Sequence, residues 1–156
     1  MEREIRLETP EQTQAFGRRL GAQLRAGDLI VLTGDLGAGK TTLAQGIGEG
    51  LGVRGPITSP TFVIARVHPS LVGGPALVHV DAYRLGSALE LDDLDLDADL
   101  DESVTIVEWG AGLVEQLSEE RLEISLTGED VRTARLVGVG ARWDDVLGPI
   151  TTAGIP

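Results

Sequence analysis

The sequence of 156 residues contains no cysteine, no asparagine and a single lysine, Lys40. Without cysteine, the chain forms no disulfide and offers no thiolate to a metal ion or to catalysis. No apolar run approaches the roughly 20 residues that a membrane helix needs. Residues 1–10 lack the apolar core of a secretion signal. We therefore expect a soluble, cytoplasmic protein.

Basic residues are also scarce, since 13 Lys and Arg stand against 25 Asp and Glu, which gives a formal net charge of −12. This balance repels a phosphate backbone and excludes an extended nucleic-acid surface on the chain. Eight acids lie within residues 90–102. A calcium-binding loop starting at Asp93, Asp95 or Asp97 would lack the glycine that its sixth position needs. We interpret this stretch as a solvated acidic face that can dock a partner.

Apolar periodicity predicts alternating helices and strands in one domain that spans residues 1–156. Glycine and proline clusters separate the predicted elements. The predicted helices are 11–25, 40–52 and 112–117, with a last helical turn at 143–147, and residues from Pro149 onward are expected to fray. The predicted strands are 28–33, 61–67, 76–81, 104–109, 121–127 and 134–139, of which the last two form a hairpin.

One motif carries chemistry. The sequence Gly34-Asp35-Leu36-Gly37-Ala38-Gly39-Lys40-Thr41 matches GxxxxGK(S/T) between a predicted strand and a predicted helix. Its glycines let backbone N–H groups surround phosphate oxygens, the helix directs its positive end at them, and Lys40 reaches the β- and γ-phosphates. The Thr41 hydroxyl is a Mg²⁺ ligand, which Thr42 can assist. An ordinary glycine turn is the alternative interpretation, but a compact ammonium suits a phosphate cradle, and the only lysine stands here.

With this motif, the order of the elements predicts an α/β fold. We expect a P-loop NTPase-like three-layer sandwich with a central, mostly parallel sheet and a C-terminal β-hairpin. Because the chain has no asparagine and no second lysine, the Asn-Lys-x-Asp motif by which common GTPases select guanine is absent. An adenine nucleotide is therefore the expected ligand.

Two predicted strands end in an acid, at Asp81 and at Glu108. A P-loop needs such a carboxylate to hold the metal ion or to orient the attacking water. Either residue can take the metal, and the residues themselves do not rank them. His79 lies two positions before Asp81 on the same face of the strand. It is therefore either a core histidine or a hydrogen-bond partner that orients Asp81.

Four sequence blocks, in this order, resemble the TsaE family of ATPases, which are required to make threonylcarbamoyladenosine on tRNA. They are residues 34–42, Ser59-Pro-Thr-Phe62, His79-Val-Asp-Ala-Tyr-Arg-Leu85 and Val107-Glu-Trp109. The first block is common to many proteins, whereas the other three at these intervals are specific to the family. The blocks extend from Gly34 to Trp109.

The resemblance implies that Lys40 and the loop backbone bind ATP phosphates and that Thr41 and Glu108 hold Mg²⁺. It also implies that Asp81 is important for hydrolysis. Residues 59–62, which include Thr61, would form the nucleotide switch, and the adenine would lie near Thr9 and Arg132. The TsaD and TsaB proteins would be the partners, and the ATP cycle would reset their complex, so that tRNA is met only indirectly. A P-loop kinase for a small molecule or nucleoside is the alternative, although the chain lacks the arginine cluster of a kinase lid.

Overall fold

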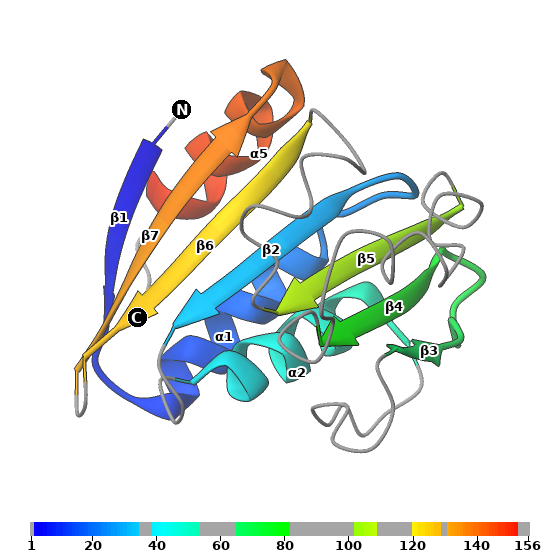
Figure 1. Cartoon of the computed structure of the whole chain (residues 1–156), viewed down its shortest axis with the longest axis horizontal. Coiled ribbons are helices and arrows are strands. Elements are labelled where there is room, and N and C mark those ends of the chain that lie inside the picture. The colour runs from blue at the N-terminus through cyan, green and yellow to red at the C-terminus, as the bar shows by residue number, and fades with distance from the viewer. Residues whose placement is uncertain are drawn as a thin grey trace.

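The computed structural model describes residues 2–34, 39–53, 65–81, 102–108, 120–128 and 131–152. These residues form a sheet with helices packed on it (Figure 1). The elements, in chain order, are β1 Glu2–Leu7, α1 Pro10–Gly21, β2 Leu29–Gly34, α2 Lys40–Leu51, β3 Ala65–His68, β4 Ala76–Asp81, β5 Ser103–Glu108, β6 Arg121–Thr127, β7 Arg132–Val139 and α5 Ala141–Thr152.

The sheet is mixed, which corrects the prediction of a mostly parallel one. Its strand order is β1-β7-β6-β2-β5-β4-β3. The central strands β6, β2, β5 and β4 run parallel to one another, whereas β1, β7 and β3 pair antiparallel with their neighbours. The reason lies in the connections, because parallel neighbours need a crossover of a dozen or more residues. The short links between β6 and β7 and between β3 and β4 permit only hairpins, and the predicted C-terminal hairpin is thereby confirmed.

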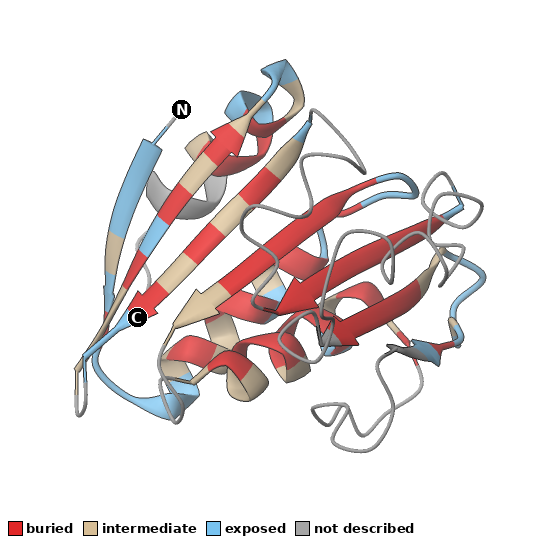
Figure 2. Ribbon diagram, in the orientation of Figure 1, coloured by how far each residue is buried: buried red, intermediate tan, exposed pale blue. Residues whose placement is uncertain are grey.

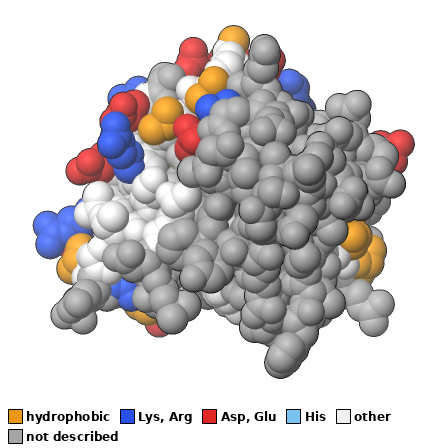
Figure 3. Space-filling model, viewed as in Figure 1, with side chains coloured by type: hydrophobic (Ala, Val, Ile, Leu, Met, Phe, Trp, Pro, Cys, Tyr) orange, Lys and Arg blue, Asp and Glu red, His pale blue; other side chains and the backbone are white. Residues whose placement is uncertain are grey.

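Strand β1 at the edge of the sheet was missed in the sequence. It pairs with β7, and only Leu7 is buried while Ile5 is half-buried. Charged side chains of both signs gather at this edge (Figure 3). One of their contacts is the ion pair between Arg135 and Glu2, with 2.8 Å from Nη2 to Oε1. The hydrogen bond to Glu2 raises the pKa of Arg135 above its usual value. A charged edge protects a sheet from unwanted pairing, but it hides the apolar alternation that identifies a strand.

Helices α1 and α2 lie side by side on one face of the sheet (Figure 1). Glycines permit their close approach. A Cβ added to Gly17 of α1 would lie 2.6 Å from the carbonyl oxygen of Leu43 in α2, and one added to Gly46 would collide with the carbonyl oxygen of Gln14. The backbones therefore touch directly, and the position of α2 depends on that of α1.

The core lies between these helices and the sheet. Strands β2, β4 and β5 are almost continuously buried, as Figure 2 shows in red. One apolar cluster joins the helices to the sheet and includes Phe16, Leu20, Leu43, Ile47, Ile30, Leu32, Ile106 and Ile124. Helix α5 joins it through Trp143, Val146 and Leu147. That helix reaches Thr152, so the prediction of one turn followed by fraying from Pro149 is wrong.

No helix among the described residues is long and apolar enough to cross a membrane. The predicted helix at 112–117 and the first part, 61–64, of the strand predicted at 61–67 lie outside the described residues.

Candidate functional site

The glycine motif begins at the end of β2 and ends in the first turn of α2. Asp35, Leu36, Gly37 and Ala38 lie outside the described residues. Gly39 is the N-cap of α2 in a left-handed conformation, with φ of 97°, which strains any residue other than glycine. No side chain caps this helix end, and its first turn contains no acid. The positive end of the helix dipole therefore suits a negatively charged ligand.

Lys40 is buried at this end of α2, with 7% of its surface exposed. Its Nζ donates a hydrogen bond of 2.8 Å to the carbonyl oxygen of Gly34, which ends β2. The ammonium thus connects the start of α2 with the end of β2. Thr41 and Thr42 follow in the same turn and are half-buried.

The two candidate carboxylates end the neighbouring strands β4 and β5, of which β5 lies beside β2. In the parallel register, Glu108 is paired with Leu32 of β2 on one side and with Asp81 of β4 on the other. Glu108 is buried, with 4% of its surface exposed. The side chain of Asp81 lies outside the described part of the chain. The structure therefore places both acids at the carboxyl edge of the parallel strands, the edge at which such sheets bind ligands.

His79 has a different partner from the one considered in the sequence. Its Nε2 lies 3.0 Å from Oε2 of Glu108, and the two side chains are 0% and 5% exposed. The hydrogen bond crosses from β4 to β5, so His79 contacts the carboxylate of the neighbouring strand. Within the described residues, this is the only hydrogen bond of the Glu108 side chain.

Two other predicted nucleotide contacts lie near α2 or α1. Arg132 reaches the start of α2, because a Cβ added to Gly39 would lie 3.8 Å from its Nε. The Nη1 of Arg132 donates to the carbonyl oxygen of Gly128 at 2.9 Å. Thr9 is the N-cap of α1, where its Oγ1 accepts a hydrogen bond of 3.1 Å from the backbone N–H of Gln12.

Thr13 was not singled out in the sequence. Its Cγ2 would lie 4.0 Å from a Cβ on Gly39, so α1 contributes to the surroundings of the start of α2. Its hydroxyl donates to the carbonyl oxygen of Thr9, and the residue is 1% exposed. The sequence offered one signal for Thr13, its place one turn after the capping Thr9. The helical pattern alone does not distinguish such a buried threonine from one on the surface.

Several predicted residues lie outside the described part of the chain. They are Thr61 with the rest of the proposed switch at 59–62, Trp109, and the acidic stretch up to Asp101. Within the described residues, no three His, Asp or Glu side chains form a ready metal cluster.

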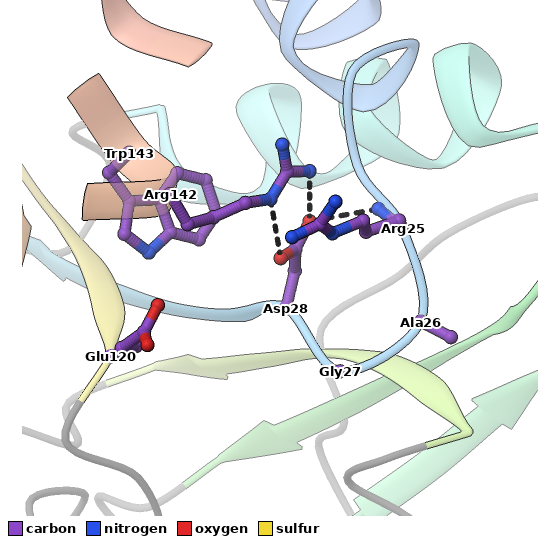
Figure 4. A pocket seen from close by; sticks show the side chains of 7 residues that line it. All are labelled: Arg25, Ala26, Gly27, Asp28, Glu120, Arg142 and Trp143. Carbon is purple, nitrogen blue, oxygen red and sulfur yellow. Dashed lines mark hydrogen bonds and ion pairs between the residues drawn. The ribbon is translucent and has the colours of Figure 1, made fainter. Parts of the chain in front are cut away.

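A cavity of about 470 Å³ lies at the opposite, amino end of β2 and β6 (Figure 4). Its lining residues include Arg25, Asp28, Glu120, Arg142 and Trp143. Arg142 binds Asp28 through two hydrogen bonds, of 2.8 and 3.2 Å, and its guanidinium lies 5.6 Å from the centre of the Trp143 ring. These charges pair with each other, so they tie α5 to the segment before β2.

The fold and the edge just described define an α/β protein in which two acids end neighbouring parallel strands and one lysine begins the helix after the central strand β2. The family model described as threonylcarbamoyl adenosine biosynthesis protein TsaE matches residues 7–137. The chain belongs to the TsaE family, which confirms the resemblance.

Named relatives agree with this assignment. The tRNA threonylcarbamoyladenosine biosynthesis protein TsaE of Streptomyces coelicolor is 61% identical over 135 residues, which cover 82% of this chain and 91% of that protein. The protein of the same name from Bacillus subtilis is 40% identical over 138 residues, covering 86% and 85%. The crystal structure of Bacillus subtilis YdiB matches with a TM-score of 0.78 at 33% identity and covers 98% of this chain and 96% of that one. The family places the protein in the biosynthesis of threonylcarbamoyladenosine on tRNA.

Proposed function

We propose that this protein is a Mg²⁺-dependent ATP-binding and ATP-hydrolysing subunit of threonylcarbamoyladenosine biosynthesis, which docks on the TsaB–TsaD complex and resets it between turnovers. The observation that carries the proposal is the buried ammonium of Lys40 at the uncapped start of α2, whose Nζ lies 2.8 Å from the carbonyl oxygen of Gly34. Gly34 ends β2, and β2 pairs with β5, the strand that ends in Glu108. A cation at a helix N-terminus is the arrangement that holds a polyphosphate.

The phosphates of ATP are assigned to the start of α2. The Lys40 ammonium and the backbone N–H groups of the first turn bind the β- and γ-phosphate oxygens. Arg132 approaches the same helix end beside Gly39 and adds a second cation. By family resemblance, the adenine lies near Thr9 and Arg132.

The residues present also fit a magnesium ion. A carboxylate as deeply buried as that of Glu108 is costly unless a cation or several donors compensate its charge, and His79 is its only hydrogen-bond partner among the described residues. Glu108 and the Thr41 hydroxyl would hold the ion, and both are oxygen ligands of the kind that Mg²⁺ prefers. When bound, the ion neutralises negative charge on the phosphates. Asp81, the register partner of Glu108, would orient the attacking water.

Charge supports a division of labour with other proteins. A net charge of −12 disfavours direct binding of tRNA but favours docking on a basic protein surface. The acidic stretch at 90–102 is our candidate for that contact.

The proposal is tested by ATPase assays of the purified protein with Mg²⁺, alone and with TsaB and TsaD of the same organism. We expect slow hydrolysis alone and faster hydrolysis with the pair. The Arg135→Ala variant, which removes an exposed cation at the β1 edge, should behave like the wild type. No stimulation and no co-purification would contradict the proposal and favour a phosphotransferase with another acceptor.

A further inference from the structure

His79 is a polar residue buried completely within the sheet. It lies in β4, is 0% exposed, and is paired in the register with Ile106 of β5. An imidazole in an apolar layer is costly unless its polar atoms have partners. Its only partner among the described residues is Glu108, and its Nδ1 has none. A side chain that served packing alone would be better replaced by leucine, so the contact with Glu108 needs an explanation.

A neutral imidazole donates through one ring nitrogen and accepts through the other, and the carboxylate decides which nitrogen donates. An ionised carboxylate can only accept hydrogen bonds, so Nε2 of His79 carries the proton and donates it to Oε2 of Glu108 across 3.0 Å. This leaves the unpartnered Nδ1 as an acceptor, which is less costly to bury than an unpartnered N–H group.

The contact also fixes the direction of the carboxylate. One oxygen is tied to β4, and the other oxygen has no hydrogen-bond partner among the described residues. Because β4 and β5 are paired, largely buried strands, the hydrogen bond restricts rotation of the Glu108 side chain. Metal-binding carboxylates are commonly held by such a partner, whose removal typically weakens metal binding 10- to 100-fold.

We propose that His79 is a positioning residue, which holds one oxygen of Glu108 so that the other faces the magnesium ion of bound nucleotide. The inference rests on the proposed function and adds to it a residue that acts through the metal ligand Glu108.

The test compares three substitutions of His79. Glutamine places an amide N–H near the position of Nε2, asparagine has a similar polar group that is one methylene too short, and leucine removes the donor. The dependence of binding of a fluorescent ATP analogue on Mg²⁺ concentration is measured for each, as is binding of Mn²⁺ by electron paramagnetic resonance. Glu108→Gln gives the reference for loss of the carboxylate charge.

We expect His79→Leu and His79→Asn to raise the Mg²⁺ concentration at half-saturation about tenfold. Binding of the nucleotide without metal should stay unchanged, and His79→Gln should stay close to the wild type. If His79→Leu does not fold, the comparison of His79→Gln with His79→Asn still tests the positioning role. Equal metal dependence in glutamine, asparagine and wild-type proteins would overturn the positioning role and leave the proposed function standing. A wild-type protein that binds no nucleotide at any Mg²⁺ concentration would instead overturn the proposed function, and this inference with it.

Discussion

Charged groups are buried at both ends of strand β2, but the partners of these groups differ between the two ends. At the amino end, Asp28 and Arg142 neutralise each other through two hydrogen bonds, and the backbone N–H of Arg25 adds a third to Asp28. At the carboxyl end, Lys40 donates to a neutral carbonyl and Glu108 accepts from an imidazole. The amino end is therefore complete without a ligand. The carboxyl end suits a ligand that brings an anion to the lysine and a cation to the glutamate.

The largest expected effect comes from Lys40→Ala, which removes the buried cation. We expect nucleotide binding to be lost, because the phosphates lose their charged partner. Binding is measured with a fluorescent ATP analogue, and circular dichroism checks the fold. Lys40→Arg keeps the charge but should not restore binding, since a guanidinium is too large for a niche in which 7% of the lysine is exposed. Tight ATP binding by Lys40→Ala would contradict the interpretation that the carboxyl end of β2, unlike the amino end, uses its buried charge to bind a ligand.

Asp28→Ala should affect stability and leave binding unchanged. The substitution removes the charged partner of Arg142, whose remaining acceptor is the carbonyl oxygen of Gln23 at 2.7 Å. We expect the free energy of unfolding to fall by about 3 kcal/mol, which corresponds to a drop in melting temperature of roughly 6–12 °C. The double variant Asp28→Ala/Arg142→Leu should recover part of this loss, because it leaves no unpaired buried charge. A nucleotide affinity in either variant that differs from that of the wild type would show that the amino and carboxyl ends of β2 are coupled.

Gly46→Ala tests whether the carboxyl end depends on the contact between the helices. The new Cβ collides with the carbonyl oxygen of Gln14 and should push α1 away from α2. We expect a loss of about 2 kcal/mol in stability and weaker nucleotide binding. Gly148→Ala in α5 is the matched control, since a Cβ there meets nothing within 4 Å. That variant should be unchanged or more stable by up to ~1 kcal/mol.

The structure shows which parts of the molecule a single sequence reveals. Local patterns were sufficient for β4, whose predicted bounds 76–81 are confirmed, and for the strand and helix that flank the glycine motif. Strand β1 was missed because its charges conceal the alternation, and its pairing with β7 joins segments more than 120 residues apart. The partner of His79 could not be predicted for a similar reason. It depends on the register between β4 and β5, which is set by packing rather than by sequence neighbours.

Glu108→Gln and Asp81→Asn separate the roles of the two acids at the carboxyl end. If Glu108 holds the metal, its substitution should raise the Mg²⁺ requirement for nucleotide binding about tenfold more than that of Asp81, because only Glu108 loses a metal-bound charge. Asp81→Asn should chiefly lower the rate of hydrolysis. Metal titrations and single-turnover hydrolysis measure the two effects. The opposite order would exchange the assignments that the resemblance gives to these residues.

The smallest expected effect concerns charge on the surface. Exposed charges are screened within about 8 Å at physiological ionic strength, whereas buried pairs are screened much less. If the acidic stretch at 90–102 contacts the partner complex, docking should weaken a few-fold between low and physiological salt. The melting temperature, which depends on the buried pair of Asp28 and Arg142, should change little over the same range. Docking measured by surface plasmon resonance that does not respond to salt would place the acidic stretch outside the interface.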